Sequence, residues 1–258
     1  MTLGAASLVS LFLIFVRISA CLLASPLFGN TTPVQVRVLL CAAIAFALNP
    51  VLSPYIQADI KNLGDFLPLI LNEVAIGILI GMCLQMVVYA AQMAGSLLDI
   101  QIGMASMQLF NPLAGSHTTL FGSLKMWLSL VLILLLDGHH MMLGAFVQSY
   151  QLTASPVVSM AEFGLVQLLG KMCLLAIQIA APAGAVALLV DIAAGIVNKS
   201  VPQMQVYMVA MPGKILMGVM AVTISLPILV SGVTAGLEHS FDALSNMTRT
   251  GGPAHGVK

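Results

Sequence analysis

The sequence predicts an all-α integral membrane protein with about six hydrophobic helical segments. Of its 258 residues, 60% are apolar and 7% are charged, whereas soluble domains carry about 25% charged residues. Nine Lys and Arg balance nine Asp and Glu, so the chain lacks the basic stripe that nucleic-acid binding requires. This composition excludes an ordinary soluble enzyme, a secreted disulfide scaffold and a disordered tail. Because apolar segments run nearly from end to end, we expect one membrane unit, residues 1–258.

The first two segments each contain a single arginine. Residues 3–28 include Arg17 and end in a turn cluster rich in Gly, Asn, Thr and Pro. No basic residue precedes Arg17, so we interpret this segment as mature structure and not as a secretory signal. Residues 34–52 carry Arg37 near their start and run into Pro50, which makes their uncharged part short for a membrane span.

The later segments are irregular in length. Residues 66–98 contain Glu73 as their only charge and would form a helix of roughly 50 Å, although the hydrocarbon core is about 30 Å thick. These runs are continuous, unlike the alternating strands of a membrane barrel. Irregular lengths favour helices that break, or that leave the bilayer and pack against protein. The other segments and a polar tail follow at residues 120–147, 163–197, 215–237 and 238–258.

The distribution of basic residues predicts the orientation by a margin of one charge. Six spans would place Arg37, Lys125, Lys199 and Lys214 on one side and Lys61, Arg249 and Lys258 on the other. Cytoplasmic loops carry an excess of basic residues. We therefore expect the loop with Lys199, Pro202, Gln203 and Lys214 to face the cytoplasm and to contact a partner.

A stripe of small and polar residues marks one face of the third segment. Glu73, Gly77, Gly81 and Gln85 recur every four residues, so they lie one above another on a helix. Gly95 lies four residues after Ala91, so this pair of small residues has the same spacing. Small residues let helix backbones approach closely, so we expect this face to meet a helix of this chain or of a partner. The alternative is that glycine is simply common in membrane helices.

Residues 99–119 form a nearly uncharged stretch rich in small residues, methionine and glutamine. Loops of about 20 residues are usually functional or disordered, and a disordered loop would be less apolar. Flexible methionines can fill irregular gaps, so the stretch could act as a compliant plug or seal. The alternative is an interfacial half-helix. The plug residues are Gln101, Gly103, Met104, Met107, Phe110, Asn111, Pro112 and Gly115.

Further polar residues inside the apolar segments are Arg17, Asp137, His139 and Asp191. An ionisable residue inside a membrane helix is costly and by default marks a functional or assembly site. Asp191 shares a helix face with Lys199, eight residues on. The alternative for Asp191 is that its side chain reaches toward a nearby interface.

We expect no metal, no cofactor and no enzymatic activity. Asp137 is followed by Gly138, His139 and His140, but adjacent histidines on a helix point about 100° apart, and no second cluster completes four ligands. A helix break or a turn is expected there instead. Ser116 beside His117 lacks a third orienting group. The four cysteines lie in apolar runs without a Cys-x-x-Cys pair and are expected to be small buried hydrophobes.

A set of short elements occurs in a fixed order along the chain: 24–28, Pro33, Arg37, 73–81, 94–95, 101–103, 110–112, 137–140, 181–182, Asp191, Gly195, 202–203 and 214–215. This ordered set resembles the FliR family, the export-gate membrane proteins of bacterial flagella, which are related to equivalent proteins of virulence type III secretion systems. The chain departs from the family at Asn111 and Asp137, where an acid and an amide are exchanged, and at Lys199, where Arg is common.

The resemblance implies a non-enzymatic subunit of the flagellar type III protein export gate, in the bacterial inner membrane at the basal body. It implies a FliP-like part, 1–160, with a plug loop at about 101–118, and a FliQ-like helical hairpin, 163–237. The implied partners are FliP-like and FliQ-like subunits, FlhB-like and FlhA-like export proteins, unfolded export substrates and membrane lipid, with no nucleic acid. Two alternatives stay open: a virulence secretion subunit, and a stand-alone small-solute permease. A permease would be expected to contain internal repeats.

Overall fold

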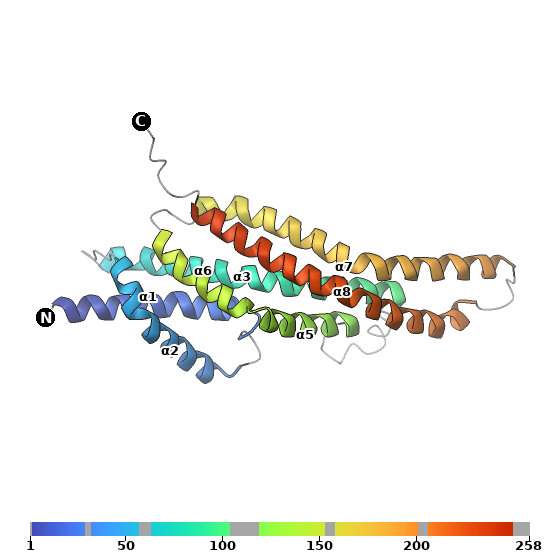
Figure 1. The fold of residues 1–258 in the computed structure, drawn as a ribbon, viewed down its shortest axis with the longest axis horizontal. Helices are drawn as coiled ribbons and strands as arrows, with labels where there is room; N and C mark the ends of the chain where they lie inside the picture. Colours follow the sequence, from blue (N-terminus) through green and yellow to red (C-terminus); the bar gives the residue numbers. More distant parts are fainter. Residues whose placement is uncertain are drawn as a thin grey trace, which may run out of the picture. The chain divides into compact units, whose positions relative to one another are not determined.

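The computed structural model describes residues 2–28, 32–56, 63–103, 119–152, 158–200 and 206–249. Within these residues the chain forms seven α-helices, one short 3-10 helix and no strand (Figure 1). The prediction of an all-α integral membrane protein is confirmed. The helices are α1 (Thr2–Ala24), α2 (Val34–Leu52), the 3-10 turn Ser53–Tyr55, α3 (Leu63–Ile102), α5 (Leu120–Leu135), α6 (Gly138–Leu152), α7 (Val158–Ser200) and α8 (Val206–Arg249).

The fourth predicted segment is divided into two helices. Asp137 separates α5 from α6 with a φ of 55°. A residue in the left-handed region cannot continue a right-handed helix, and Asp is one of the few residues that tolerates this region. The helix break expected at residues 137–140 is therefore present.

Three helices are longer than the sequence predicted. α3, α7 and α8 contain 40, 43 and 44 residues, which correspond to about 60–66 Å at 1.5 Å per residue. α7 continues through Ser200 and α8 begins at Val206, so most of the loop expected between Lys199 and Lys214 is helical. Among the described residues, four helices are long and apolar enough to cross a membrane, or five if the bent α5–α6 pair is one span, and the apolar part of α1, Leu8–Ala24, is shorter.

The chain divides into two compact units. The first comprises Met1–Met86, Asp137–Leu169 and Leu237–Lys258. Its core is formed by apolar side chains of α1, α2, α3 and α6, which are almost completely buried. They include Leu13, Ile14, Ile18, Leu22, Leu52, Ile80, Leu84 and Phe146.

The second unit comprises Val87–Leu136 and Gly170–Gly236. Its α7 and α8 form an antiparallel hairpin. Lys214, early in α8, contacts Asp191, late in α7. A Cβ at Gly232, eighteen residues further along α8, would lie 2.9 Å from the side chain of Ile179, which comes earlier in α7. A cluster of buried residues joins this hairpin to α3 and α5. It consists of Leu98, Ile102, Phe121, Ala183 and Val222.

Candidate functional site

A buried ion pair joins α1 to α3 in the first unit. Arg17 donates from Nε to Oε2 of Glu73 at 2.5 Å and from Nη2 to Oε1 at 3.0 Å. The two side chains are 2% and 8% exposed, so the pair is withdrawn from solvent. Two parallel N–H···O bonds match the planar guanidinium to the carboxylate, which is the strongest form of such a pair. The two predicted polar residues therefore neutralise one another inside the helix bundle.

Helix α6 completes this network with a hydroxyl from each of two adjacent residues. Tyr150 donates its hydroxyl to Oε2 of Glu73 at 3.0 Å, and Arg17 donates from Nη1 to Oγ of Ser149 at 2.8 Å. The Arg17 guanidinium carbon also lies 3.6 Å from the centre of the Tyr150 ring, a cation–π geometry. A buried charge without such partners would be costly, so the network holds α1, α3 and α6 in one arrangement.

The predicted small-residue stripe brings α1 and α3 together just beyond this pair. A Cβ at Gly77 would overlap the carbonyl oxygen of Arg17, and a Cβ at Gly81 would overlap the carbonyl oxygen of Cys21 and lie 2.7 Å from the Cβ of Ala24. Only glycine permits such a close approach of two backbones. Gln85, one turn further along α3, is partly exposed.

A second buried carboxylate connects α3 to the start of α5. Asp99 is 1% exposed and accepts hydrogen bonds from the backbone N–H groups of Phe121 and Gly122 at 2.9 and 3.1 Å. These are the second and third residues of α5, whose own N-cap residue, Thr119, makes no side-chain cap bond. Asp99 thus supplies the cap from another helix, where the helix dipole favours a negative charge.

Gly95 permits this junction because it brings the two backbones into contact. A Cβ at Gly95 would lie 2.6 Å from the Cα of Gly122 and would overlap the carbonyl oxygen of Phe121. The start of α5 therefore rests directly on α3, one turn before Asp99. Gly95 meets another helix of the same chain, within the second unit.

The predicted plug begins where α3 ends. Gln101 is exposed in the last turn of α3, and Gly103 follows with a φ of 87°, a left-handed conformation that favours glycine. The other predicted plug residues lie outside the described residues, so their assignment stays a prediction. They are Met104, Met107, Phe110, Asn111, Pro112 and Gly115.

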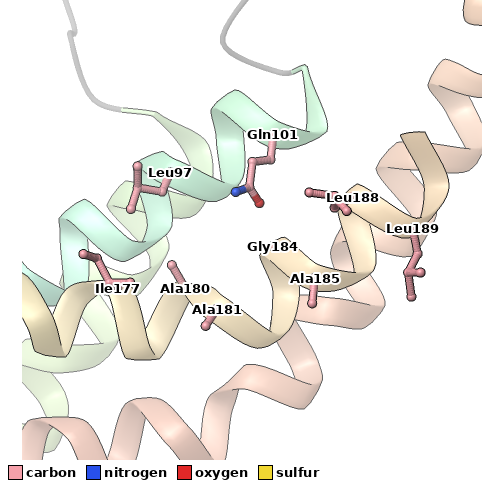
Figure 2. A pocket seen from close by; sticks show the side chains of 9 residues that line it. All are labelled: Leu97, Gln101, Ile177, Ala180, Ala181, Gly184, Ala185, Leu188 and Leu189. Carbon is pink, nitrogen blue, oxygen red and sulfur yellow. The ribbon is translucent and has the colours of Figure 1, made fainter. Parts of the chain in front are cut away.

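Gln101 also borders an open pocket between α3 and α7, shown in Figure 2. The pocket has a volume of about 560 Å³ and is otherwise lined by leucine, isoleucine, alanine and Gly184. A Cβ at Gly184 would lie 2.8 Å from Oε1 of Gln101, so glycine leaves room for the glutamine side chain. With one amide and no titratable group in its lining, the pocket suits an apolar occupant.

Asp191 has a partner that the sequence spacing did not indicate. Lys214 of α8 donates to Oδ1 of Asp191 in α7 at 2.7 Å, and their side chains are 19% and 48% exposed. This pair bridges the two helices of the hairpin, whereas Lys199 is exposed in the last turn of α7. Pro202 and Gln203 lie outside the described residues.

The position of Lys125 removes the one-charge excess on which the predicted membrane orientation was based. It is 0% exposed within α5, and its ammonium nitrogen has no hydrogen-bond partner among the described residues. It is not a loop charge, so three basic residues remain on each side of the membrane in the sequence-based count. The cytoplasmic placement of the loop at residues 201–205 stays a prediction that now depends on the family resemblance.

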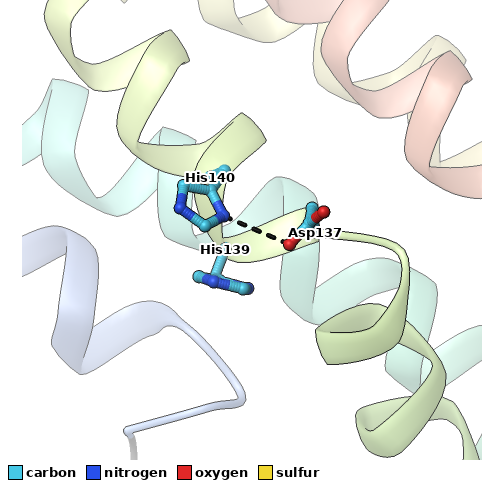
Figure 3. Close-up of side chains that lie close together, drawn as sticks. All are labelled: Asp137, His139 and His140. Atoms are coloured by element: carbon cyan, nitrogen blue, oxygen red, sulfur yellow. Dashed lines mark hydrogen bonds and ion pairs between the residues drawn. The ribbon is translucent and has the colours of Figure 1, made fainter.

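The side chains of Asp137, His139 and His140 converge at the start of α6 (Figure 3). The centres of the two imidazole rings are 4.2 Å apart, and Nδ1 of His140 lies 3.3 Å from Oδ1 of Asp137. The two rings therefore lie close together, contrary to the expectation that neighbouring histidines on a helix point apart.

Sequence reasoning missed Asp99, Ser149 and Tyr150 as parts of these networks. A general signal was present for two of them: an arginine and a glutamate in apolar runs need hydrogen-bonding partners, and hydroxyl groups near the end of another apolar run can supply them. Asp99 gave a similar signal, because it is an acidic residue that can accept hydrogen bonds from the free N–H groups at the start of the next helix. The identity of each partner depends on helix packing and cannot be read from spacing.

These features define an all-α, multi-pass membrane protein whose buried polar side chains join its helices. The chain belongs to the bacterial export proteins, family 1, the family of FliR, because that family's model matches residues 8–240. It is 28% identical to the flagellar biosynthetic protein FliR of Bacillus subtilis over 93% of this chain and 96% of the relative. It is 29% identical to FliR of Caulobacter vibrioides over 83% and 87% of the two chains.

A relative from another secretion system is similar over a comparable length. The secretion system apparatus protein SsaT of Salmonella typhimurium is 27% identical over 86% of this chain and 87% of its own. As a FliR-family protein, the chain is a membrane component of a type III export apparatus. Its partners belong among the components of that apparatus.

Proposed function

We propose that this chain is a non-enzymatic subunit of the flagellar type III protein export gate in the bacterial inner membrane. Together with FliP-like and FliQ-like subunits it would form the channel through which unfolded flagellar proteins leave the cytoplasm. The full-length similarity to several flagellar FliR proteins supports this assignment.

One observation carries the proposal: the apolar part of α7 is too long and too exposed for a protein that works alone. Gln167–Ser200 is a helical stretch of 34 residues with a mean hydropathy typical of membrane spans, although it includes Lys171, Asp191 and Lys199, and it is about 51 Å long. To fit a hydrocarbon core of about 30 Å, it would have to tilt by about 54°, beyond the 0–40° seen for membrane helices. Its exposed side chains include Leu174, Leu188, Leu189, Ile192, Ile196 and Val197.

Apolar side chains beyond the bilayer need cover from other protein. A multi-subunit gate provides such cover, whereas a stand-alone permease does not. We assign residues 1–160 to the FliP-like part and 163–237 to the FliQ-like hairpin, and the antiparallel pairing of α7 with α8 supports the second assignment.

The plug assignment for residues 101–118 and the partner contact at 199–214 belong to the same proposal. The segment from Lys199 to Lys214, most of which is helical, would face the cytoplasm and contact FlhB-like or FlhA-like export proteins. Reversal of the Lys199 charge with Glu should impair export more than Ala, because it replaces attraction to an acidic partner surface with repulsion. Exposed pairs contribute only about 0–1 kcal/mol, so the expected defect is partial.

Co-purification in a mild detergent tests the assembly. The tagged chain should retain FliP-like and FliQ-like subunits in a defined complex, and deletion of its gene should abolish motility. Recovery of the chain alone or as a homo-oligomer, with motility intact, would support the permease alternative. Loss of virulence secretion with normal motility would support the other alternative, a subunit of a virulence type III secretion system. The similarity to SsaT is the observation that favours this alternative.

The orientation is tested with a cysteine at Gln203. The control background should carry Cys173→Ser, because Cys173 is exposed whereas Cys21, Cys41 and Cys83 are buried. A membrane-impermeant thiol reagent should label the new cysteine only in inverted vesicles. Labelling in intact spheroplasts would place residues 201–205 outside the cytoplasm and remove the proposed partner contact.

A further inference from the structure

The bend between α5 and α6 gathers three metal-ligating side chains on one turn. The backbone oxygen of Asp137 accepts hydrogen bonds from the N–H groups of His140 and Met141 at 2.9 and 3.1 Å, which fixes the first turn of α6. Asp137 itself is in the left-handed region. Figure 3 shows the three side chains around this turn, with the dashed contact joining His140 to Asp137 and the His139 ring below them.

The distances approach those of a metal centre. One ligand atom from each of Asp137, His139 and His140 can be chosen so that all three lie within 4.8 Å of one another. Ligands at about 2.0–2.1 Å from a tetrahedral zinc ion are separated by about 3.3 Å. The contact between Nδ1 of His140 and Oδ1 of Asp137, at 3.3 Å, already has this length.

The remaining adjustment is small and falls on exposed side chains. The side chains of His140 and Asp137 are 71% and 73% exposed, so rotations of their terminal bonds meet few neighbours. Nδ1 of His139 has no hydrogen-bond partner within the described part of the chain although it is shielded from solvent. An imidazole nitrogen in this situation is available to a metal.

We propose that Asp137, His139 and His140 bind a divalent transition-metal ion of the zinc class. Two imidazoles and one carboxylate form an N/O ligand set that favours Zn²⁺, Ni²⁺ or Cu²⁺ over Mg²⁺ and Ca²⁺, which prefer oxygen ligands alone. Exposure of the turn leaves the fourth position to water or to a group from a neighbouring protein. The bound ion would tie Asp137 to the first turn of α6, within the first unit.

A helix cap alone explains less of the geometry. The contact of Asp137 with His140 is a normal use of an acidic residue at a helix start. It does not account for the convergence of His139, whose ring lies 4.2 Å from that of His140 and whose Nδ1 has no protein partner among the described residues. A metal ion supplies one common partner for all three side chains.

Calorimetric titration with Zn²⁺ tests the proposal. The full chain is purified in mild detergent, with the subunits that accompany it, on an affinity tag without histidine. One Zn²⁺ should bind per chain, and Mg²⁺ should not compete. His139→Gln and His140→Gln should each weaken Zn²⁺ binding at least about tenfold. Even the loss of a residue that only supports a metal ligand typically lowers metal affinity by about this factor. His239→Gln, at an exposed histidine of α8, is the matched control and should bind as the wild type.

Asp137→Asn keeps the test decisive if a histidine variant fails to fold. Asn caps helices as well as Asp and tolerates the left-handed region, but its neutral amide is a poor ligand. Its Zn²⁺ affinity should fall with the complex intact, and the visible absorption bands of tetrahedral Co²⁺, present in the wild type, should be lost. Wild-type Zn²⁺ affinity and Co²⁺ bands in Asp137→Asn would overturn the site. Neither result bears on the export proposal.

Discussion

Replacement of Glu73 by Gln should destabilise the first unit far more than the small chemical change implies. The glutamine keeps the size of Glu73 but cannot offer two anionic oxygens to the guanidinium, so Arg17 remains buried at 2% exposure without a counter-charge. Breaking a buried pair from one side typically costs about 3–5 kcal/mol. Tyr150→Phe is the graded comparison, since it removes one hydrogen bond to a charged group, about 1.5–3 kcal/mol, and retains the ring over Arg17.

The double variant separates the charge from the packing. Arg17→Met combined with Glu73→Gln leaves no buried charge, and replacement of both members of such a pair is often close to neutral. The free energy of unfolding, measured by titration of detergent-solubilised protein with SDS and followed by far-UV circular dichroism, should therefore be lower in each single variant than in the double variant. A coupling energy near zero in this double-mutant cycle would refute the reasoning.

Three further outcomes are expected. Gly81→Leu should block assembly by forcing α1 away from α3, whereas Gly144→Leu, at a position with no atom within 4 Å of a new Cβ, should leave the yield of the purified complex unchanged; equal yields would remove the close-packing argument. Deletion of residues 103–115 should leave the complex assembled but raise ion conductance in planar bilayers, and conductance at the background level would show that the plug assignment is wrong. Lys214→Glu should reduce motility more than Lys214→Ala, because it places a second carboxylate against Asp191, and addition of Asp191→Lys should restore part of it; no rescue would mean that the pair of α7 and α8 is not what the substitution disturbs.

The helices were predictable because their causes are local. Runs of apolar residues of this length form helices in lipid whatever surrounds them, and the break at Asp137 follows from polar and flexible residues in the middle of such a run. The stripe of Gly77 and Gly81 could be recognised for the same reason, since a spacing of four residues places both on one face. That α1 is the helix they meet required the structure.

The partners of the buried charges could not be predicted because they are not local. Arg17 and Glu73 are 56 residues apart in the chain, and Ser149 lies 132 residues from Arg17. The pairing of Asp191 with Lys214 spans 23 residues and depends on the unexpected extension of α8 to Val206. Lys125 shows the reverse error, because a basic residue counted as a loop charge is buried in a helix.

The cap that Asp99 places on α5 also changes the entropy of the chain between the two helices. The bond from Phe121 to Asp99 closes a ring of 22 residues. The length-dependent part of its configurational penalty is three-halves RT times the logarithm of length, about 2.7 kcal/mol. Once that penalty is met, a doubling of the ring adds only about 0.6 kcal/mol. Added length between residues 104 and 118 should therefore weaken the junction of α3 and α5 by less than about 1 kcal/mol for each doubling of the ring, so the stability of this junction constrains the length of the proposed plug only weakly.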